Sequence, residues 1–459
     1  MNELKGKLGL RDTTTILIGG MIGSAIFSLA GVTILGAGPA SLISWVIAAI
    51  ILFAYALQTA ELSTMFPHSG GVFVFPAKAL GKTEKQGRLW GWISSWAYLF
   101  GCIAGAAFSA IYVGIYLGVS FEALNGWQVP IAILAVVICG VLNIIKISAM
   151  GKINTVLTVG LALTMLIFVV CGLTSGKWDG GALVPFFTQG GDGAFGFMGA
   201  IPIAMVAFGS IVAASFMVGE IKNPKKTVPK AMTISMIIVL ILYLLMILTT
   251  LGLVTAGFLM KNPGMAYIPM FAAVFTSLSS MPWLGIVISI SAVLALITTI
   301  LVVMLLAART LQASAEGGIL PKFLAKNNSK TNVPVNAQLI VILVVGVISA
   351  FPDATNFIVN FGSLCNAIVV AMICLTIIAA RRKYPEITEK FKAPGGTVLP
   401  IIIFIIIIAS YVPGIIQGGY MLWVWTAVYY VLGLIIYAVG ARKRNLADKI
   451  EVKSENISS

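Results

Sequence analysis

The sequence has few of the side chains that carry acid–base, redox or metal chemistry. Its single histidine is His68, and Asp and Glu together number 15 among 459 residues. One histidine cannot build a metal cluster or a proton relay. The five cysteines lie inside apolar segments without the spacing of metal ligands or disulfides. We therefore expect neither a bound metal nor a cofactor. A membrane enzyme is a poor interpretation, because catalysis needs titratable groups that converge.

Charge is also scarce, and its absence from long segments defines the class of protein. Charged residues make up 10% of the chain, hydrophobic residues make up 59%, and the mean hydropathy is +1.04. Apolar runs of about 20 residues can cross the ~30 Å hydrocarbon core of a bilayer as helices. We predict an all-α polytopic membrane protein with about twelve spans. They are expected at residues 13–38, 41–65, 90–119, 128–145, 153–174, 196–218, 231–253, 284–312, 335–351, 355–379, 398–416 and 420–440.

The basic residues are distributed asymmetrically between the loops. If the N-terminus is cytoplasmic, all 29 Lys and Arg residues except Lys177 and Lys261 face the cytoplasm. The positive-inside rule therefore predicts a multi-pass protein of the cell membrane whose termini, residues 1–12 and 441–459, are both cytoplasmic. The net charge of +14 then reflects topology and contact with the lipid bilayer rather than nucleic-acid binding. The polar tail at 441–459 is predicted to be disordered.

Two predicted spans contain glycine and serine at mid-membrane depth. The first carries GGMIGSAIF at residues 19–27, and the sixth carries MVAFGSIVAAS at residues 205–215. These spans would occupy matching positions in two halves of opposite orientation, which form an inverted repeat. Broken helices at such positions point to the central site of a transporter. For a single Gly-x-x-x-Gly pattern, such as Gly19 and Gly23, helix packing is the alternative.

A break inside hydrocarbon leaves backbone groups that need partners. We expect the N–H groups of Gly23, Ser24 and Ala25 to begin a half-helix whose positive end suits a carboxylate. Carbonyl groups freed near Ala207 and Phe208 would suit an ammonium group. A ligand with a carboxylate and an amine on one carbon would satisfy both sets.

Five stretches carry a resemblance to the amino acid–polyamine–organocation superfamily of transporters. GGMIGSAIF resembles the Gly-x-Ile-Gly-x-Gly-Ile-Phe signature of that family, with Ala25 where glycine is usual. The others are AELSTMFPHSGGVFVF (60–75), GEIKNPKKTVPKAM (219–232), ARTLQASAEGGILPKF (308–323) and RRKYPEITEKFKAPGG (381–396). The resemblance implies a LeuT-like fold, with five-helix inverted repeats at 13–174 and 196–379 whose leading helices are broken, and two peripheral helices at 398–440.

The resemblance also implies a substrate pocket. Its expected residues are Met21, Ile22, Gly23, Ser24 and Ala25 in the first span, Gly101, Cys102, Ala106 and Ser109 in the third, and Ala207, Phe208, Gly209, Ile211 and Val212 in the sixth. Helix packing is the alternative for the residues of the third span and for Phe208. Thr298 and Thr299 in the eighth span are candidates for coupling or gating, unless their hydroxyls only bond back to their own helix.

Several positions bear on coupling and specificity. Val212 stands where many relatives carry glutamate, and Gly160 stands where several proton-coupled relatives carry lysine. Gly160 and Glu61 are the remaining candidates for coupling or gating, although a structural hydrogen bond is an equal alternative for Glu61. Val206 aligns with the gating tryptophan of the arginine–agmatine antiporter. Because the expected pocket offers no counter-charge, we predict a neutral substrate with an apolar or aromatic side chain.

Together these features predict a secondary transporter for amino acids that works by alternating access. Exchange and proton-coupled symport both stay open, so protons are a candidate partner. An amine or polyamine exchanger of the same superfamily is the alternative, and a channel fits less well because it needs a filter ring. No Gly-x-x-x-x-Gly-Lys-Ser/Thr loop for ATP is present in the sequence. Monomer and homodimer are both compatible with the sequence.

Overall fold

The computed structural model describes residues 8–66, 71–145, 150–216, 221–328, 333–385, 391–417 and 420–458. The regular secondary structure within these ranges is helical, apart from one isolated β-bridge between Leu8 and Ile221. Nine helices in the same ranges are long and apolar enough to cross a membrane, and the shorter apolar helices Val335–Ser349 and Val398–Tyr411 accompany them. The prediction of an all-α polytopic membrane protein is confirmed, whereas the inverted repeat and the exact number of spans stay predictions.

The helices follow the predicted spans closely, with short extra helices between them. The first part of the chain forms α1 (Leu10–Met21), α2 (Ser24–Ala37), α3 (Ser41–Met65), α4 (Gly71–Ala79), α5 (Glu84–Ser120), α6 (Gln128–Ile145) and α7 (Met150–Thr174). The second part forms α8 (Gly196–Met205), α9 (Ala213–Phe216), α10 (Pro224–Leu253), α11 (Ala256–Lys261), α12 (Pro269–Thr276), α13 (Pro282–Glu316), α14 (Val335–Ser349), α15 (Thr355–Lys383), α16 (Val398–Gln417) and α17 (Met421–Ser458). Two 3₁₀ segments, η5 (Val206–Val212) and η7 (Pro263–Tyr267), matter for the site.

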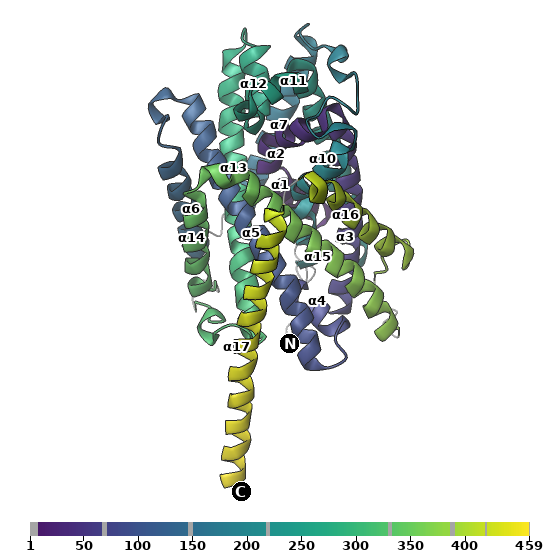
Figure 1. Ribbon diagram of the computed structural model, residues 1–459, viewed down its shortest axis with the longest axis vertical. Helices are drawn as coiled ribbons and strands as arrows, with labels where there is room; N and C mark the ends of the chain where they lie inside the picture. Colours follow the sequence, from purple (N-terminus) through teal and green to yellow (C-terminus); the bar gives the residue numbers. More distant parts are fainter. Residues whose placement is uncertain are drawn as a thin grey trace.

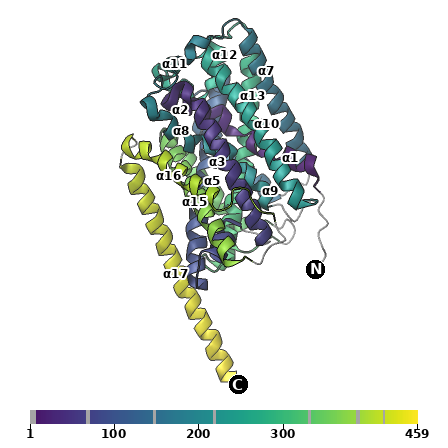
Figure 2. The same cartoon turned by 90° about the vertical axis from the view of Figure 1, so that its right-hand side faces the viewer.

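The long helices α5 and α13 form the centre of the bundle. They pack against each other more extensively than any other pair of elements, and α15 also lies along α5. Residues 101–110 of α5 read GCIAGAAFSA, and small side chains of this kind allow helix backbones to approach closely in a membrane. Figures 1 and 2 place α11 and α12 at one end of the bundle. Figure 1 shows α4 at the opposite end. We call these the α11 end and the α4 end.

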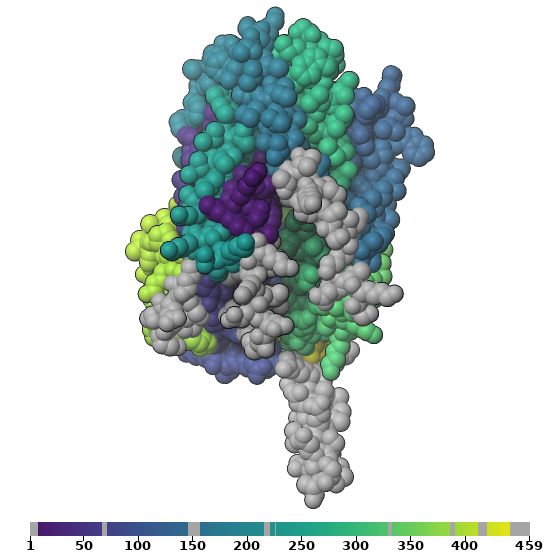
Figure 3. Space-filling view, turned by 180° about the vertical axis from the view of Figure 1, so that it is seen from behind, coloured from purple at the N-terminus to yellow at the C-terminus, as the bar shows by residue number. Residues whose placement is uncertain are grey.

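The expected interruption of the first span is present. Helix α1 stops at Met21, Ile22 has a non-helical ψ of 78°, and Gly23 is extended before α2 starts at Ser24. Figure 3 shows α1, in purple, on the face where it lies beside α10, in teal. At the break itself, Met21, Ile22 and Ser24 are buried, so the two half-helices end and begin inside the bundle.

The sixth span differs from the expectation. The chain does not unwind there, because α8 continues into the 3₁₀ segment η5 and then into α9. Met205 and Ala213, which flank η5, keep right-handed helical backbone angles. A 3₁₀ helix bonds each carbonyl to the N–H three residues ahead. The carbonyl groups of Ala207 and Phe208 therefore belong to a hydrogen-bonded turn, and the expectation that they are freed by a break is wrong.

The disorder predicted for the C-terminal tail stays a prediction. Helix α17 continues from the membrane-length segment through residues 441–458, which composition predicts to be disordered. Figure 1 shows its last turns extending away from the bundle. The tail contains five Lys or Arg residues, two Glu and two Ala, which are good helix formers, so a preceding helix propagates through it at little cost.

Candidate substrate-binding site

A cavity of about 170 Å³ lies beside the break of the first span. Its wall combines α1, α2, α3, α5, α8, η5, α9, α13 and α15, so segments far apart in the sequence enclose it together. The expected site residues that line it are Met21, Gly23, Ser24, Ala25, Gly101, Cys102, Ala207, Gly209, Val212 and Thr299. One cavity therefore joins residues from the first, third, sixth and eighth predicted spans.

Other expected residues lie outside the cavity wall. They are Ile22, Ala106, Ser109, Phe208, Ile211 and Thr298, together with Glu61 and Gly160. Thr298 donates its hydroxyl hydrogen bond to the Ala295 carbonyl of its own helix at 2.8 Å. Gly160 is exposed on α7, and a Cβ added to it would meet no atom within 4 Å.

The start of α2 is held by two hydroxyl groups. The backbone N–H of Ser24 donates to Thr299 Oγ1 at 3.0 Å, and Thr299 also donates to the Ala295 carbonyl at 2.9 Å. The back-bonding alternative therefore describes the Thr299 hydroxyl, which also accepts from Ser24, and a coupling or gating role stays a prediction. Ser109 donates to Ser24 Oγ at 3.1 Å, so it supports the break from behind the cavity wall. The Ser24 N–H is already satisfied in this state.

The two ends of the break have opposite electrostatic character. The C-terminus of α1 carries partial negative charge, and the N-terminus of α2 carries partial positive charge. They face each other across Ile22 and Gly23, where the Gly23 N–H donates to the Met21 carbonyl at 2.7 Å. The Tyr243 hydroxyl donates to the same carbonyl. A zwitterion at this break would place its carboxylate toward α2 and its ammonium toward α1.

Phe208 belongs to an aromatic cluster on the far side of η5. Its ring centroid lies 6.0 Å from that of Trp45 and 5.4 Å from that of Tyr243. Trp45 and Tyr243 also form an edge-to-face pair with centroids 5.2 Å apart. The Phe208 side chain is fully buried there, so the packing alternative describes its position.

The cavity extends from the break toward the α4 end. Ser109 and Thr299 mark the level of the break, because both contact Ser24. The lining residues of α5 all precede Ser109, and the other lining residues of α13 follow Thr299. Both directions lead to the α4 end, since α5 starts directly after α4, and a Cβ at Gly317, which follows the end of α13, would lie 2.7 Å from the Phe73 ring of α4.

The α11 side of the break is closed by direct contacts. The Tyr116 hydroxyl donates to the Phe27 carbonyl at 2.6 Å, which fixes α5 against α2. A Cβ at Gly31 would lie only 2.0 Å from the Ala266 carbonyl oxygen of η7. Glycine is thus required where η7 covers α2, and the covered side leaves no space for a passage at this point.

Several cavity residues are missing from the sequence-based prediction. Tyr55 comes from α3, Tyr98 from α5, Ser210 from η5 and Asn366 from α15. Ser210 alone had a local signal, because it follows Gly209 in the sixth span. The other three sit in apolar helices without a motif, and only tertiary packing brings them to the cavity.

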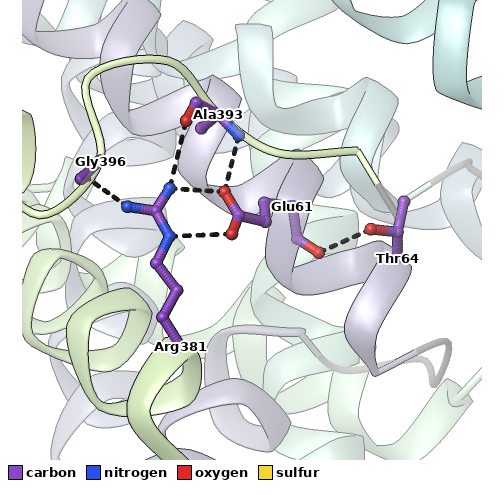
Figure 4. Close-up of polar contacts among 5 residues, drawn as sticks. All are labelled: Glu61, Thr64, Arg381, Ala393 and Gly396. Carbon is purple, nitrogen blue, oxygen red and sulfur yellow. Dashed lines mark hydrogen bonds and ion pairs between the residues drawn. The ribbon is translucent and has the colours of Figure 1, made fainter. Parts of the chain in front are cut away.

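Glu61 takes part in an ion pair away from the cavity (Figure 4). Arg381 donates from Nε to Glu61 Oε1 at 2.9 Å and from a terminal nitrogen to Oε2 at 2.6 Å. The Ala393 N–H donates to the same carboxylate at 2.7 Å, and Arg381 also donates to the carbonyls of Ala393 and Gly396. This network ties α3 to α15 and to the segment that follows α15. These contacts agree with the alternative that Glu61 has a structural, hydrogen-bonding role.

Comparisons with known proteins agree with the geometry. The family model described as amino acid permease matches residues 8–440. The branched-chain amino acid permease BcaP of Bacillus subtilis is 27% identical over 96% of this chain and 94% of its own length. BcaP of Lactococcus lactis is 28% identical over 95% of each chain. The serine/threonine exchanger SteT of Bacillus subtilis is 29% identical over 56% of this chain and 57% of its own.

Proposed function

The chain belongs to the amino acid permease family, and we propose that it carries neutral amino acids with apolar or aromatic side chains across the cell membrane. Permeases are transporters rather than enzymes, so the substrate leaves the protein chemically unchanged. The names of the similar permeases and of the exchanger support neutral amino acids as the substrate class.

The cavity composition is the observation that carries this proposal. Among the described residues that line the cavity, none is Asp, Glu, Lys, Arg or His. A charged side chain in this space would lose its hydration without gaining a counter-charge, which is costly in a low-dielectric site. The α-carboxylate and α-ammonium groups, in contrast, have the two helix ends of the break as partners.

We further propose that the protein works by alternating access, with the α4 end in the cytoplasm. The α4 end carries Lys78, Lys82 and Lys85, while Lys261 lies at the α11 end. The positive-inside rule assigns the more basic end to the cytoplasm. With the α11 side closed, the described arrangement is then an inward-directed state. Opening it outward would require η7 and α5 to separate from α2.

Exchange is the coupling mode that the geometry favours. No carboxylate lines the cavity in the described part of the chain, and Gly160 provides no ammonium group. Glu61 is engaged by Arg381 and by the Ala393 N–H, so its charge already has a fixed counter-charge. A carrier without a carboxylate, a histidine or an amine at its site is expected to exchange one substrate molecule for another rather than to couple uptake to a proton.

Counterflow in proteoliposomes tests this function. Vesicles preloaded with a neutral amino acid such as leucine or phenylalanine are expected to take up the labelled form of the same amino acid much faster than empty vesicles. An imposed inside-alkaline pH gradient in empty vesicles is expected to add little. Channel-like flux without stimulation by internal substrate would contradict the carrier mechanism, and strong pH-driven accumulation would contradict exchange.

A further inference from the structure

The cavity contains an amide group that forms no hydrogen bond with any other described residue. Asn366 of α15 lines the cavity and is half-buried. Its side chain points at α5, because a Cβ at Gly101 would lie 2.5 Å from Asn366 Oδ1. The absence of a side chain at Gly101 therefore provides the space that the Asn366 amide occupies. Within the described part of the chain, the Asn366 side chain makes no hydrogen bond to another residue.

The surroundings of Asn366 are mainly apolar. Val302, Val303, Leu306, Val369 and Val370 line the same half of the cavity. The Cys102 thiol pairs with the Tyr98 side chain rather than with Asn366. A ligand that fills the cavity would displace water from this amide, and an amide left unpaired in such surroundings is unfavourable. A ligand group that bonds the amide would remove this cost.

The distance between Asn366 and the break limits the length of such a ligand. Ser109 contacts Ser24 at the break, and Gly101 meets Asn366. Residues 101 and 109 of α5 are eight positions apart, which corresponds to about 12 Å at ~1.5 Å per residue. The side chain of serine or leucine, held by its backbone groups at the break, ends far short of Asn366.

A para-substituted aromatic ring has the required length. With carbon–carbon bonds of ~1.5 Å, the tyrosine hydroxyl lies roughly 6 Å from its Cα, and a hydrogen bond of about 3 Å at each end completes the span. The cavity volume of about 170 Å³ also suits a ring, because a cavity of about 150 Å³ holds benzene.

We propose that Asn366 is a specificity-determining residue that hydrogen-bonds the polar tip of an aromatic substrate side chain, so that the protein prefers tyrosine to phenylalanine. This inference rests on the proposed function and names the substrate within its class. In this arrangement the apolar walls contact the aromatic ring and the break binds the carboxylate and ammonium groups. The Asn366 amide forms a hydrogen bond with the hydroxyl group. A site built to bond a substrate hydroxyl discriminates strongly against the analogue that lacks it.

Counterflow of tyrosine and phenylalanine by the full chain in proteoliposomes tests the proposal. The two substrates differ by one hydroxyl group, so the ratio of their apparent affinities isolates its recognition. We expect the wild-type protein to favour tyrosine by about 10-fold or more, the size of one satisfied buried hydrogen bond. Asn366→Leu keeps the approximate size of the side chain and removes the amide, so the ratio should fall to about 1.

Two further variants separate recognition from folding. Asn360→Leu is the matched control, because Asn360 is exposed on the same helix and bonds the Asn356 carbonyl at 2.8 Å. It should keep the wild-type ratio. Gly101→Ala should displace the amide and lower the ratio, even if Asn366→Leu fails to fold. Equal affinities for tyrosine and phenylalanine in the wild type, or an unchanged ratio in Asn366→Leu and Gly101→Ala, would overturn the proposal. Exchange of no neutral amino acid at all would instead refute the proposed function.

Discussion

Ala25→Leu is expected to abolish amino acid exchange. Ala25 is 5% exposed, lines the cavity and lies in the first turn of α2 beside Ser24. A leucine side chain there would occupy the space in which the substrate carboxylate must approach the positive end of α2. We expect apparent affinity to fall by about 100-fold, equivalent to about 3 kcal/mol of lost binding free energy. Counterflow and equilibrium binding measure this change.

Two controls separate a blocked site from a misfolded protein. Ala25→Gly, which restores the residue usual in related transporters, should keep exchange. Gly346→Leu adds the same side chain on α14, where a Cβ meets no atom within 4 Å, and should leave both affinity and thermal stability near wild type. If Ala25→Leu bound substrate as tightly as these controls, the break would not be the carboxylate site.

Glu61→Ala is expected to destabilise the protein by about 3–5 kcal/mol, because it leaves Arg381 without its counter-charge in a mostly buried position. The Glu61 and Arg381 side chains are 5% and 19% exposed. Removing the carboxylate also deprives the Ala393 N–H of its acceptor, so the segment after α15 loses its link to α3. Thermal unfolding of the purified protein in detergent measures the effect.

The ion pair of Glu84 and Arg88 provides a comparison in which the carboxylate is exposed, while the Arg88 side chain is 23% exposed. These side chains lie 3.2 Å apart on one face of α5, and the Glu84 side chain is 78% exposed. Glu84→Ala should change stability by less than about 1 kcal/mol, since water already screens this pair. The double variant Glu61→Gln with Arg381→Gln should lose less than the sum of the single variants. Equal melting temperatures for Glu61→Ala and Glu84→Ala would show that the buried network does not hold the helices together.

The break in the first span was predictable because its cause is local. Gly19, Gly20, Gly23 and Ser24 weaken a membrane helix by themselves, and the chain stops being helical between Met21 and Ser24. The sixth span carries only Gly209 and Ser210 in this region, and a 3₁₀ turn accommodates both without loss of hydrogen bonding. Glycine and serine thus indicated where the α-helix is interrupted, but not whether the backbone becomes non-helical or forms a 3₁₀ turn.

Asn366 was not predictable from its own segment. Its neighbours in α15 are apolar or small, as in any membrane helix, and its position at the cavity depends on how α15 packs along α5. The pocket position predicted for Phe208 differs from its observed position for the same reason. Its place next to Gly209 in the sequence suggests that its side chain lines the pocket, whereas its ring packs against Trp45 and Tyr243 outside the cavity wall. Helix rotation within the bundle, which one sequence does not encode locally, decides both cases.

The central claim is that the break binds the carboxylate and the ammonium group of one amino acid together. Competition against labelled phenylalanine by unlabelled phenylalanine, phenethylamine and 3-phenylpropanoate tests it most directly, since the two analogues each lack one of these groups. We expect phenylalanine to compete and both analogues to be weaker by about 100-fold, the effect of losing charge-assisted hydrogen bonds worth about 3 kcal/mol. Equal competition by phenethylamine would indicate an amine carrier and contradict the account.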